Sequence, residues 1–403
     1  MSFSFHIAKL SDIAYLNPRF AESLESDAPV SFVPMSAVTA ETASTTTGED
    51  RCYCEVSKGY TPFLNGDVLV AKITPCFENG KIAQATLTHR FGFGSTEFHV
   101  IRPRTGKADA RYLLHFLRQE HIRRNGERKM TGSAGQRRVP VHFFAGLEIP
   151  LPPLPDQKRI AAVLDKAEEL RAKRRAALAL LDSLTQSIYL AMFGDPASNP
   201  KELITKPLCD LVIEFRYGTS NKSQNDGKPA LRIPNVIGGY IDFSELKLVP
   251  VSNAEFVRLR LVDGDVLFVR TNGNPDFVGR CAVFDSAVMK ATGFSGNEFI
   301  FASYLIRARL ADEVTPIFLR EFMLGNEGRK ALRSRSKTSA GQFNINTENL
   351  GAIQIPLPPL PLQHEFARRV AAVEKLKTAH RAALAELDAL FASLQYRAFR
   401  GEL

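Results

Sequence analysis

The sequence predicts an α+β fold: two mixed, strand-rich domains separated by two long antiparallel coiled-coil helices, with an internal pseudo-twofold duplication. Three observations lead to this prediction. A segment of the first half of the chain recurs in the second half, and each copy continues into a helical stretch without glycine or proline. The rest of the chain consists of short β-prone runs between glycine, proline and asparagine clusters. A length of 403 residues is enough for two to four domains.

The repeat defines the domain order. The motif IPLPPLP occurs at Ile149–Pro155 and again at Ile355–Pro361, 206 residues later, and 21 of the 45 positions that begin there are identical without a gap. The tetrapeptide SAGQ precedes each motif at the same spacing, at Ser133–Gln136 and Ser339–Gln342. The predicted parts are a first strand-rich domain over residues 1–148, a proline lead-in and first long helix over 149–197, a second strand-rich domain over 198–354, and a second lead-in and helix over 355–403.

The stretch from Gln157 to Phe193 predicts one long helix, which Gly194-Asp195-Pro196 would end. The prolines before it favour an extended, stiff lead-in. A seven-residue period places apolar residues on one side of this helix and of its copy, which predicts a coiled-coil seam. The seam positions are Ile160, Val163, Ala167, Leu170, Arg174, Ala177, Leu181, Leu184, Ile188 and Ala191, and in the second copy Phe366, Arg369, Val373, Leu376, His380, Ala383, Leu387, Leu390, Leu394 and Arg397.

A helix with an exposed apolar stripe needs a partner, and the other copy is the obvious one. If the first helix carries the chain from one domain to the other, about 55 Å at 1.5 Å per residue, the second must return. We therefore expect antiparallel pairing. The alternative is two helical hairpins in separate cores.

The two domains are expected to be built on antiparallel sheet. Thr39–Asp50 has the composition of a mobile loop. The expected strands cover Asp67–Ile73, Phe98–Arg102, Asp265–Arg270 and Phe299–Ile306, and the expected short helices cover Ala110–Gln119 and Ile317–Leu324.

The charge distribution indicates a polyanionic partner. The chain has 52 lysines and arginines against 43 acids, a formal charge of +9. Eleven of the basic residues lie between Arg102 and Arg138 against three acids, and eight lie between Arg307 and Lys337 against four. Each basic segment runs into its SAGQ motif, whose small hydrogen-bonding groups a phosphate can approach. We therefore predict a surface for double-stranded DNA in each domain; solvated surface and an ordinary turn are the alternatives.

Candidate DNA-binding residues come from these segments and from polar loops that follow strands, since arginine and glutamine suit base edges in the major groove. The candidates are Arg128, Lys129, Gln136, Arg137, Arg138, Lys72 and Thr74 in the first domain, and Tyr217, Lys222, Arg270, Thr271, Asn272, Arg335, Lys337 and Gln342 in the second.

Motifs for catalysis are not found. The sequence has no GxxxxGK[ST] loop, GxGxxG, HExxH or GxSxG, and Asn274-Pro275-Asp276-Phe277 lacks the second proline of the segment with which adenine methyltransferases hold a base. The five cysteines and eight histidines have no metal-ligand spacing. We expect no catalytic residue, metal or cofactor in this chain, and, without a signal peptide or an apolar run of about 18 residues, a cytoplasmic location.

The sequence resembles the specificity subunit of type I restriction-modification enzymes. The resemblance rests on the duplicated IPLPPLP followed by Gln157 or Gln363, the RAALxxLD helices, SAGQ, and GDVLFVRTNG with Val278-Gly279-Arg280. It covers nearly the whole chain in the family's order of target-recognition domain, helix, target-recognition domain, helix. Lys72-Ile73-Thr74-Pro75 replaces the RTNG-type residues in the first half, which puts the contacts of that loop in doubt.

The resemblance implies that each domain recognises one half of an interrupted DNA target and that the paired helices set the spacing. It also implies docking of two modification subunits, which hold S-adenosylmethionine and methylate adenine, and of restriction subunits that use ATP and magnesium. The rival interpretations are a self-contained nuclease or methyltransferase, a coiled-coil scaffold without DNA contact, and a free-standing repressor.

Overall fold

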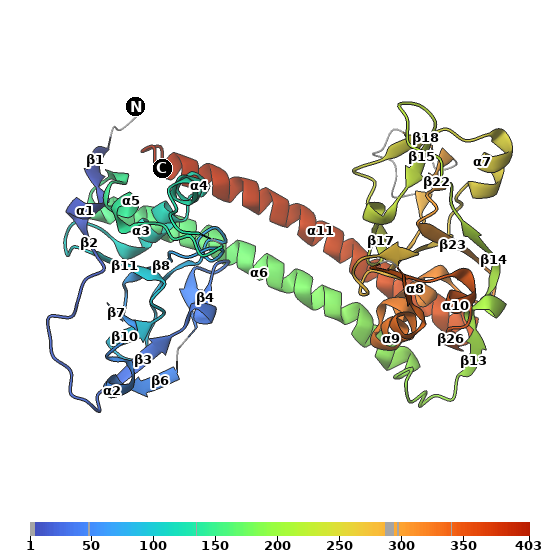
Figure 1. Cartoon of the computed structure of the whole chain (residues 1–403), viewed down its shortest axis with the longest axis horizontal. Helices are drawn as coiled ribbons and strands as arrows, with labels where there is room; N and C mark the ends of the chain where they lie inside the picture. The colour runs from blue at the N-terminus through green and yellow to red at the C-terminus, as the bar shows by residue number, and fades with distance from the viewer. Residues whose placement is uncertain (1–4, 47–48, 134, 287–293, 296–297, 340) are drawn as a thin grey trace. The chain divides into compact units, whose positions relative to one another are not determined.

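The computed structural model describes residues 5–46, 49–133, 135–286, 294–295, 298–339 and 341–403. The chain forms two compact units, one made of Met1–Ala177 with His380–Leu403 and the other of Leu178–Ala379. Two helices, α6 (Leu154–Phe193) and α11 (Leu360–Ala398), each contribute to both units (Figure 1). The domain limits at residues 148, 197 and 354 stay predictions.

The first unit is built on two larger sheets. One has the strand order β2-β11-β8-β9-β5-β4 and the other β6-β3-β10-β7. Its strands are β1 (His6–Lys9), β2 (Ala14–Leu16), β3 (Pro29–Val33), β4 (Val38–Thr39), β5 (Ser44–Thr45), β6 (Glu49–Cys52), β7 (Thr61–Leu64), β8 (Val68–Ala71), β9 (Ile82–Gln84), β10 (Phe91–Gly94), β11 (Phe98–Pro103) and β12 (Glu148–Leu151). Its shorter helices are α1 (Leu10–Ile13), η1 (Met35–Ala37), α2 (Tyr53–Val56), α3 (Ala110–Leu117), α4 (Glu120–Arg128) and α5 (Val141–Ala145).

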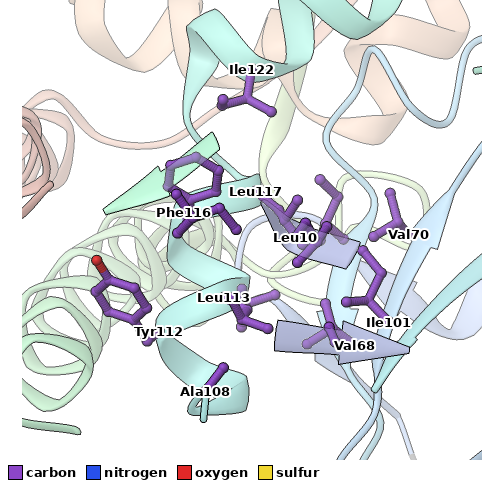
Figure 2. Packing of buried hydrophobic residues seen from close by; sticks show 14 of the residues in the cluster. Leu10, Val68, Val70, Ile101, Ala108, Tyr112, Leu113, Phe116, Leu117 and Ile122 are labelled. Carbon is purple, nitrogen blue, oxygen red and sulfur yellow. The ribbon is translucent and has the colours of Figure 1, made fainter. Parts of the chain in front are cut away.

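Helix α3 closes the main core of this unit. Asp109 begins the helix by accepting a hydrogen bond from the Tyr112 backbone N–H at 3.0 Å. Figure 2 shows Leu113 and Leu117 of this helix pointing toward Val68 and the other buried side chains of the sheet. Burial of these apolar side chains against β8 and β11 therefore fixes α3 on the sheet.

The second unit repeats this plan with different loops. Its sheets have the orders β14-β23-β19-β21, β18-β15-β22, β20-β25-β24 and β16-β17. Its strands are β13 (Ile204–Pro207), β14 (Val212–Tyr217), β15 (Lys228–Leu231), β16 (Val236–Ile237), β17 (Tyr240–Ile241), β18 (Lys247–Val249), β19 (Val266–Val269), β20 (Thr271–Asn272), β21 (Cys281–Val283), β22 (Ile300–Phe301), β23 (Leu305–Leu310), β24 (Lys337–Ser339), β25 (Gln342–Asn344) and β26 (Gln354–Leu357). Its shorter helices are η2 (Leu208–Leu211), η3 (Ile233–Asn235), α7 (Asn253–Leu259), α8 (Pro316–Leu324), α9 (Asn326–Arg335) and α10 (Thr347–Gly351).

Both short helices that the sequence predicts are confirmed by α3 and α8, and three of the four strands by β8, β11 and β19. The prediction of one strand over Phe299–Ile306 is wrong. β22 pairs with β15 and β23 pairs with β14 and β19, so the chain changes sheets between them. The pattern of apolar residues does not reveal this change of sheet, because the residues of β22 and the first residues of β23 are all buried.

The prediction of a mobile loop over Thr39–Asp50 is also wrong. β5 lies in this stretch and joins the six-stranded sheet through Ser44 and Gln84, and β6 begins at Glu49. Residues 47–48 of this stretch lie outside the described residues. A strand of two residues is too short to give a periodic signal in the sequence.

The proline lead-ins are strands of two-stranded ribbons. β12 pairs antiparallel with β1, and β26 pairs antiparallel with β13. Such a ribbon has no interior strand, so the missing N–H groups of Pro150 and Pro356 disrupt no larger ladder. Each long helix then begins at the leucine before the last proline of the motif, three residues earlier than predicted for the first.

Within each unit the two long helices run antiparallel. In the first unit Arg171 of α6 pairs with Asp388 of α11, and Arg159 donates to the carbonyl of Leu403 at 3.0 Å. In the second unit Lys377 pairs with Asp182 at 3.0 Å. The two ion pairs occupy positions 206 residues apart on both helices, so they confirm the pseudo-twofold duplication. They exclude two helical hairpins in separate cores.

The predicted coiled-coil seam is only partly correct, because four of its 20 positions are buried, eight are half-buried and eight are exposed. Ile160, Ala167, Phe366 and Val373 are buried, but the positions three residues after such residues are exposed, for example Leu170 at 42% and Leu376 at 51%. The second buried row lies four residues after the first instead, at Leu164, Val370 and Lys377, and Arg171 at the equivalent position is half-buried. The buried side of each long helix is therefore rotated from the predicted seam toward the domain on which the end of that helix packs. A row of leucines on the predicted seam stays exposed to solvent.

Among the described residues, one helix, α6, is long and apolar enough by composition to cross a membrane. Its apolar end supplies Tyr189 and Phe193 to the core of the second unit, where both rings contact Phe366. Packing within the protein thus accounts for the apolar character of this end of the helix.

Candidate nucleic-acid interface

In the second unit, two separately predicted motifs form one small sheet. β20 pairs with β25 through Thr271 and Asn344, and β24 pairs with β25 through Lys337 and Asn344. The SAGQ motif lies at the turn between β24 and β25. This sheet, residues 270–272, 337–339 and 342–344, is called the hairpin platform of the second unit.

The first unit contains the same arrangement. Ile73 and Thr131 each form a β-bridge with Arg138. Val139 donates its backbone N–H to the carbonyl of Lys72 at 2.9 Å, as Ile345 does to the carbonyl of Arg270 at 2.9 Å. Residues 72–74, 131–133 and 136–138 are therefore the hairpin platform of the first unit, and residues 134 and 340 at the two turns lie outside the described residues.

An aromatic side chain supports the second platform. The guanidinium of Arg270 lies over the ring of Tyr217, 4.7 Å from its centroid. The hydroxyl of Tyr217 accepts the backbone N–H of Thr347 at 3.1 Å. The Arg270 side chain also donates to the carbonyl of Ser303 at 3.4 Å. These contacts hold the Arg270 side chain in place at the edge of the hairpin platform.

The candidate basic residues of the first unit differ in how far they are engaged. Arg138 donates to both carboxylate oxygens of Glu97 at 2.9 and 2.8 Å, and this hydrogen bonding lowers the pKa of Glu97 against the opposing effect of its burial. Among the described residues, the ion-pair partner of Arg137 is Glu78 at a distance of 3.8 Å, and the Arg137 side chain is 44% exposed. The hydroxyl of Thr74 donates to Glu78 at 2.7 Å. Arg137 is thus the freer cation.

Other candidates surround the platforms. In the first unit α4 ends at Arg128, and Lys129 caps it; both are exposed and lead directly into the hairpin. In the second unit Arg335 ends α9 and donates to the carbonyl of Ala352 at 3.3 Å. Lys222 is exposed in the loop after β14 and no described contact joins it to the platform.

Residues that the sequence analysis did not single out complete the two sites. In the first platform Glu97 orients Arg138, and Glu78 accepts the hydroxyl of Thr74. In the second, the hydroxyl of Thr271 donates to the side-chain oxygen of Gln342 at 3.1 Å, and Asn344 faces the same side as Thr271. Acidic residues tens of positions away in the chain give no local signal, so pairing between strands was needed to find them.

One group of possible metal ligands occurs among the described residues: His115, Asp165 and Glu168. Arginines already neutralise both carboxylates, since Arg111 pairs with Asp165 and Arg118 donates to Glu168 at 2.7 Å. Burial raises the pKa of Asp165, but hydrogen bonds from His115 and Arg111 outweigh it and bring the value to about 2. Two guanidinium groups beside the carboxylates oppose a cation, so this cluster is a structural ion-pair network between α3 and α6.

Comparison with known proteins adds to this geometry. Residues 7–179 match the family model for the type I restriction modification DNA specificity domain. The EcoAI specificity subunit of Escherichia coli is 39% identical over 191 residues, which is 44% of this chain and 32% of that subunit. The EcoKI specificity subunit of Escherichia coli K12 is 28% identical over 342 residues, 80% of this chain and 72% of the relative. The match thus spans about a third of the EcoAI subunit's own length.

The fold has a similar solved example. The crystal structure of the type I restriction-modification system S subunit from M. genitalium aligns with 98% of this chain and 96% of its own, with a TM-score of 0.57 and 14% identity. At this identity the likeness concerns the fold alone.

Proposed function

Because this chain is similar to the specificity subunits of type I restriction-modification enzymes, we propose that it belongs to their family and is the non-catalytic subunit that determines the DNA sequence specificity of such a complex. Each target-recognition domain binds one half of an interrupted double-stranded target. The observation that carries this proposal is the duplicated hairpin platform, which stands next to basic residues in both units but has different side chains at equivalent positions. Two hairpin platforms with the same backbone arrangement but different side chains are suited to bind two half-sites of different sequence.

The two long helices separate the half-site contacts and dock two modification subunits. In the first unit Leu170, Ala177, Leu387 and Leu390 line a groove between α6 and α11. Leu184 and Leu376 occupy the equivalent positions in the second unit and are also exposed. Soluble monomers rarely leave such a leucine row in water, and two copies of it fit two partner subunits.

The chemistry resides in the partners. The modification subunits hold S-adenosylmethionine and methylate adenine, and restriction subunits use ATP and magnesium. The chain works in the cytoplasm, where the complex meets DNA. The target-recognition domains are residues 1–148 and 198–354, and the spacer segments are residues 149–197 and 355–403.

Mapping of methylated adenines in the host genome, with and without this gene, tests the proposal. We expect a bipartite methylated sequence that disappears when the gene is deleted and returns when it is restored. The purified chain alone should transfer no methyl group from S-adenosylmethionine. An unchanged methylation pattern after deletion, or methyl transfer by the chain alone, would contradict the assignment.

A further inference from the structure

The two hairpin platforms have matching residues just after their turns, although the strands beside them differ. Gly135 and Gly341 both have a φ of +77°, and a Cβ at either would meet no atom within 4 Å. Gln136 and Gln342 follow them and are both exposed. The positive φ explains the two glycines, because other residues rarely adopt it. It does not explain why the next residue is glutamine in both copies.

Packing within the protein does not explain the glutamines either. Gln342 receives a hydrogen bond from the hydroxyl of Thr271, but Ile73 occupies the position of Thr271 in the first unit and has no such group. The side chain of Gln136 is exposed and forms no hydrogen bond with another described residue. The identity of the two residues therefore indicates a common external partner.

The strands beside the turns show the opposite pattern. Arg137 and Arg138 follow the turn in the first unit, where the second unit has Phe343 and Asn344. Arg138 is held by Glu97, whereas Asn344 lies next to Thr271 and Lys337. One platform thus presents an oriented guanidinium where the other presents an amide. Guanidinium and amide groups favour different bases in the major groove.

What two different half-sites have in common is the sugar–phosphate backbone, and what distinguishes them is the base edges. We propose that Gln136 and Gln342 contact the DNA backbone in both half-sites, whereas the strand residues that follow them, Arg138 and Asn344, determine the base specificity of each half-site. This inference rests on the proposed DNA-specificity function. The turn glutamines would then contribute affinity for any DNA sequence, and the strand residues would contribute specificity for particular bases.

The experiment measures binding of the complex with its modification subunits to the cognate duplex and to duplexes with single base changes in each half-site, over a range of salt concentrations. Gln342→Ala should lower the affinity for all duplexes by a similar factor of several-fold, because a backbone contact is independent of sequence. The salt slope should not change, since the amide is neutral. Gln342→Lys should raise the affinity and steepen the slope by roughly 0.9 through one added phosphate contact.

Asn344→Ala should change the base preference in one half-site only. Thr338→Val is the matched control, because Thr338 is exposed on the neighbouring strand β24 and its side chain lies on the opposite face of the sheet from Asn344. This variant should bind like the wild type. Thermal melting of each variant chain verifies that these exposed substitutions leave the fold intact.

Two results would overturn the inference while the DNA-specificity function stands. Altered base preference in Gln342→Ala would make the turn a base-reading element, and unchanged affinity in both Gln342 variants would leave the turn without a DNA contact. Failure of the wild-type complex to distinguish the cognate duplex from the others would instead overturn the proposed function, and this inference with it.

Discussion

Two buried glutamines join each long helix to its own domain. The side chain of Gln157 accepts the backbone N–H of Asp109 at 2.9 Å and donates to the carbonyls of Lys107 and Pro152. Gln363 makes the same three bonds with Thr315, Glu313 and Pro358. Asp109 and Thr315 are the residues that cap α3 and α8, so each glutamine fixes the start of a long helix to a short helix of the domain.

Replacement of Gln157 by leucine should destabilise the first unit. Leucine keeps the volume but leaves one N–H and two carbonyl groups buried without partners, which costs about 3 kcal/mol at roughly 1 kcal/mol each. Urea unfolding measures the loss. Gln354→Leu is the control, because Gln354 is exposed and makes one weak bond, at 3.4 Å to the carbonyl of Ala352. Equal effects of the two substitutions would show that the buried bonds do not matter.

The arginines of the first platform should differ in their effect on DNA binding. Alanine at both Arg137 and Arg138 should weaken binding and flatten its salt dependence, by roughly one unit of slope for each of the two that binds a phosphate. Most of the change in slope should come from Arg137, since Glu97 already partly neutralises Arg138. Affinity measured against salt concentration tests this. Unchanged affinity and slope in the double variant would assign the cluster to surface solubility.

Asp165 makes the first unit sensitive to acid. Its pKa of about 2 in the folded protein lies below the usual value of roughly 4. The stabilisation is therefore complete above about pH 4 and is lost as the pH falls toward 2. Thermal melting between pH 5 and pH 2 should show a flatter decline in Asp165→Asn than in the wild type. Parallel declines would mean that the ion-pair network with Arg111 and His115 contributes nothing.

At the scale of elements, the long helices show how tertiary packing rotates a predicted stripe. The repeat correctly indicates two helices and one of their two buried rows. The second row lies at a spacing of four residues, because each helix packs both on its partner and on a domain. For the same reason the sequence does not distinguish the inner Leu164, which is fully buried, from the outer Leu170, which is 42% exposed.

Leu164 and Leu170 should therefore respond differently to alanine. Leu164→Ala should lower the free energy of unfolding by about 2–5 kcal/mol, the range for buried leucines, and Leu170→Ala by less than about 1 kcal/mol. Leu170→Ala should instead weaken the association with a modification subunit, which co-purification measures. A large loss of stability in Leu170→Ala would instead indicate that Leu170 is buried between the two helices, as the heptad pattern predicts.

At the scale of the whole molecule, the spacer role of the helices gives a direct test. Insertion or removal of about one turn in both α6 and α11, roughly 6 Å at 1.5 Å per residue, should change the number of base pairs between the half-sites. Both half-site sequences should stay the same, because neither platform is altered. Methylation-site mapping measures the spacing, and a retained spacing in a folded, active variant would contradict the spacer role.

The sequence by itself determined the duplication, the two long helices, the short helices α3 and α8 and the basic segments, because each of these is encoded by a local period, a repeated motif or a local excess of charge. The tertiary structure alone decided which side of each long helix is buried, where the chain changes sheets between β22 and β23, and that the loop after β19 forms a sheet with the SAGQ hairpin. The partners in these cases are far apart in the chain: Thr271 binds Gln342, and Glu97 holds Arg138. Such contacts depend on strand pairing over tens of residues, and no local pattern of side chains encodes them.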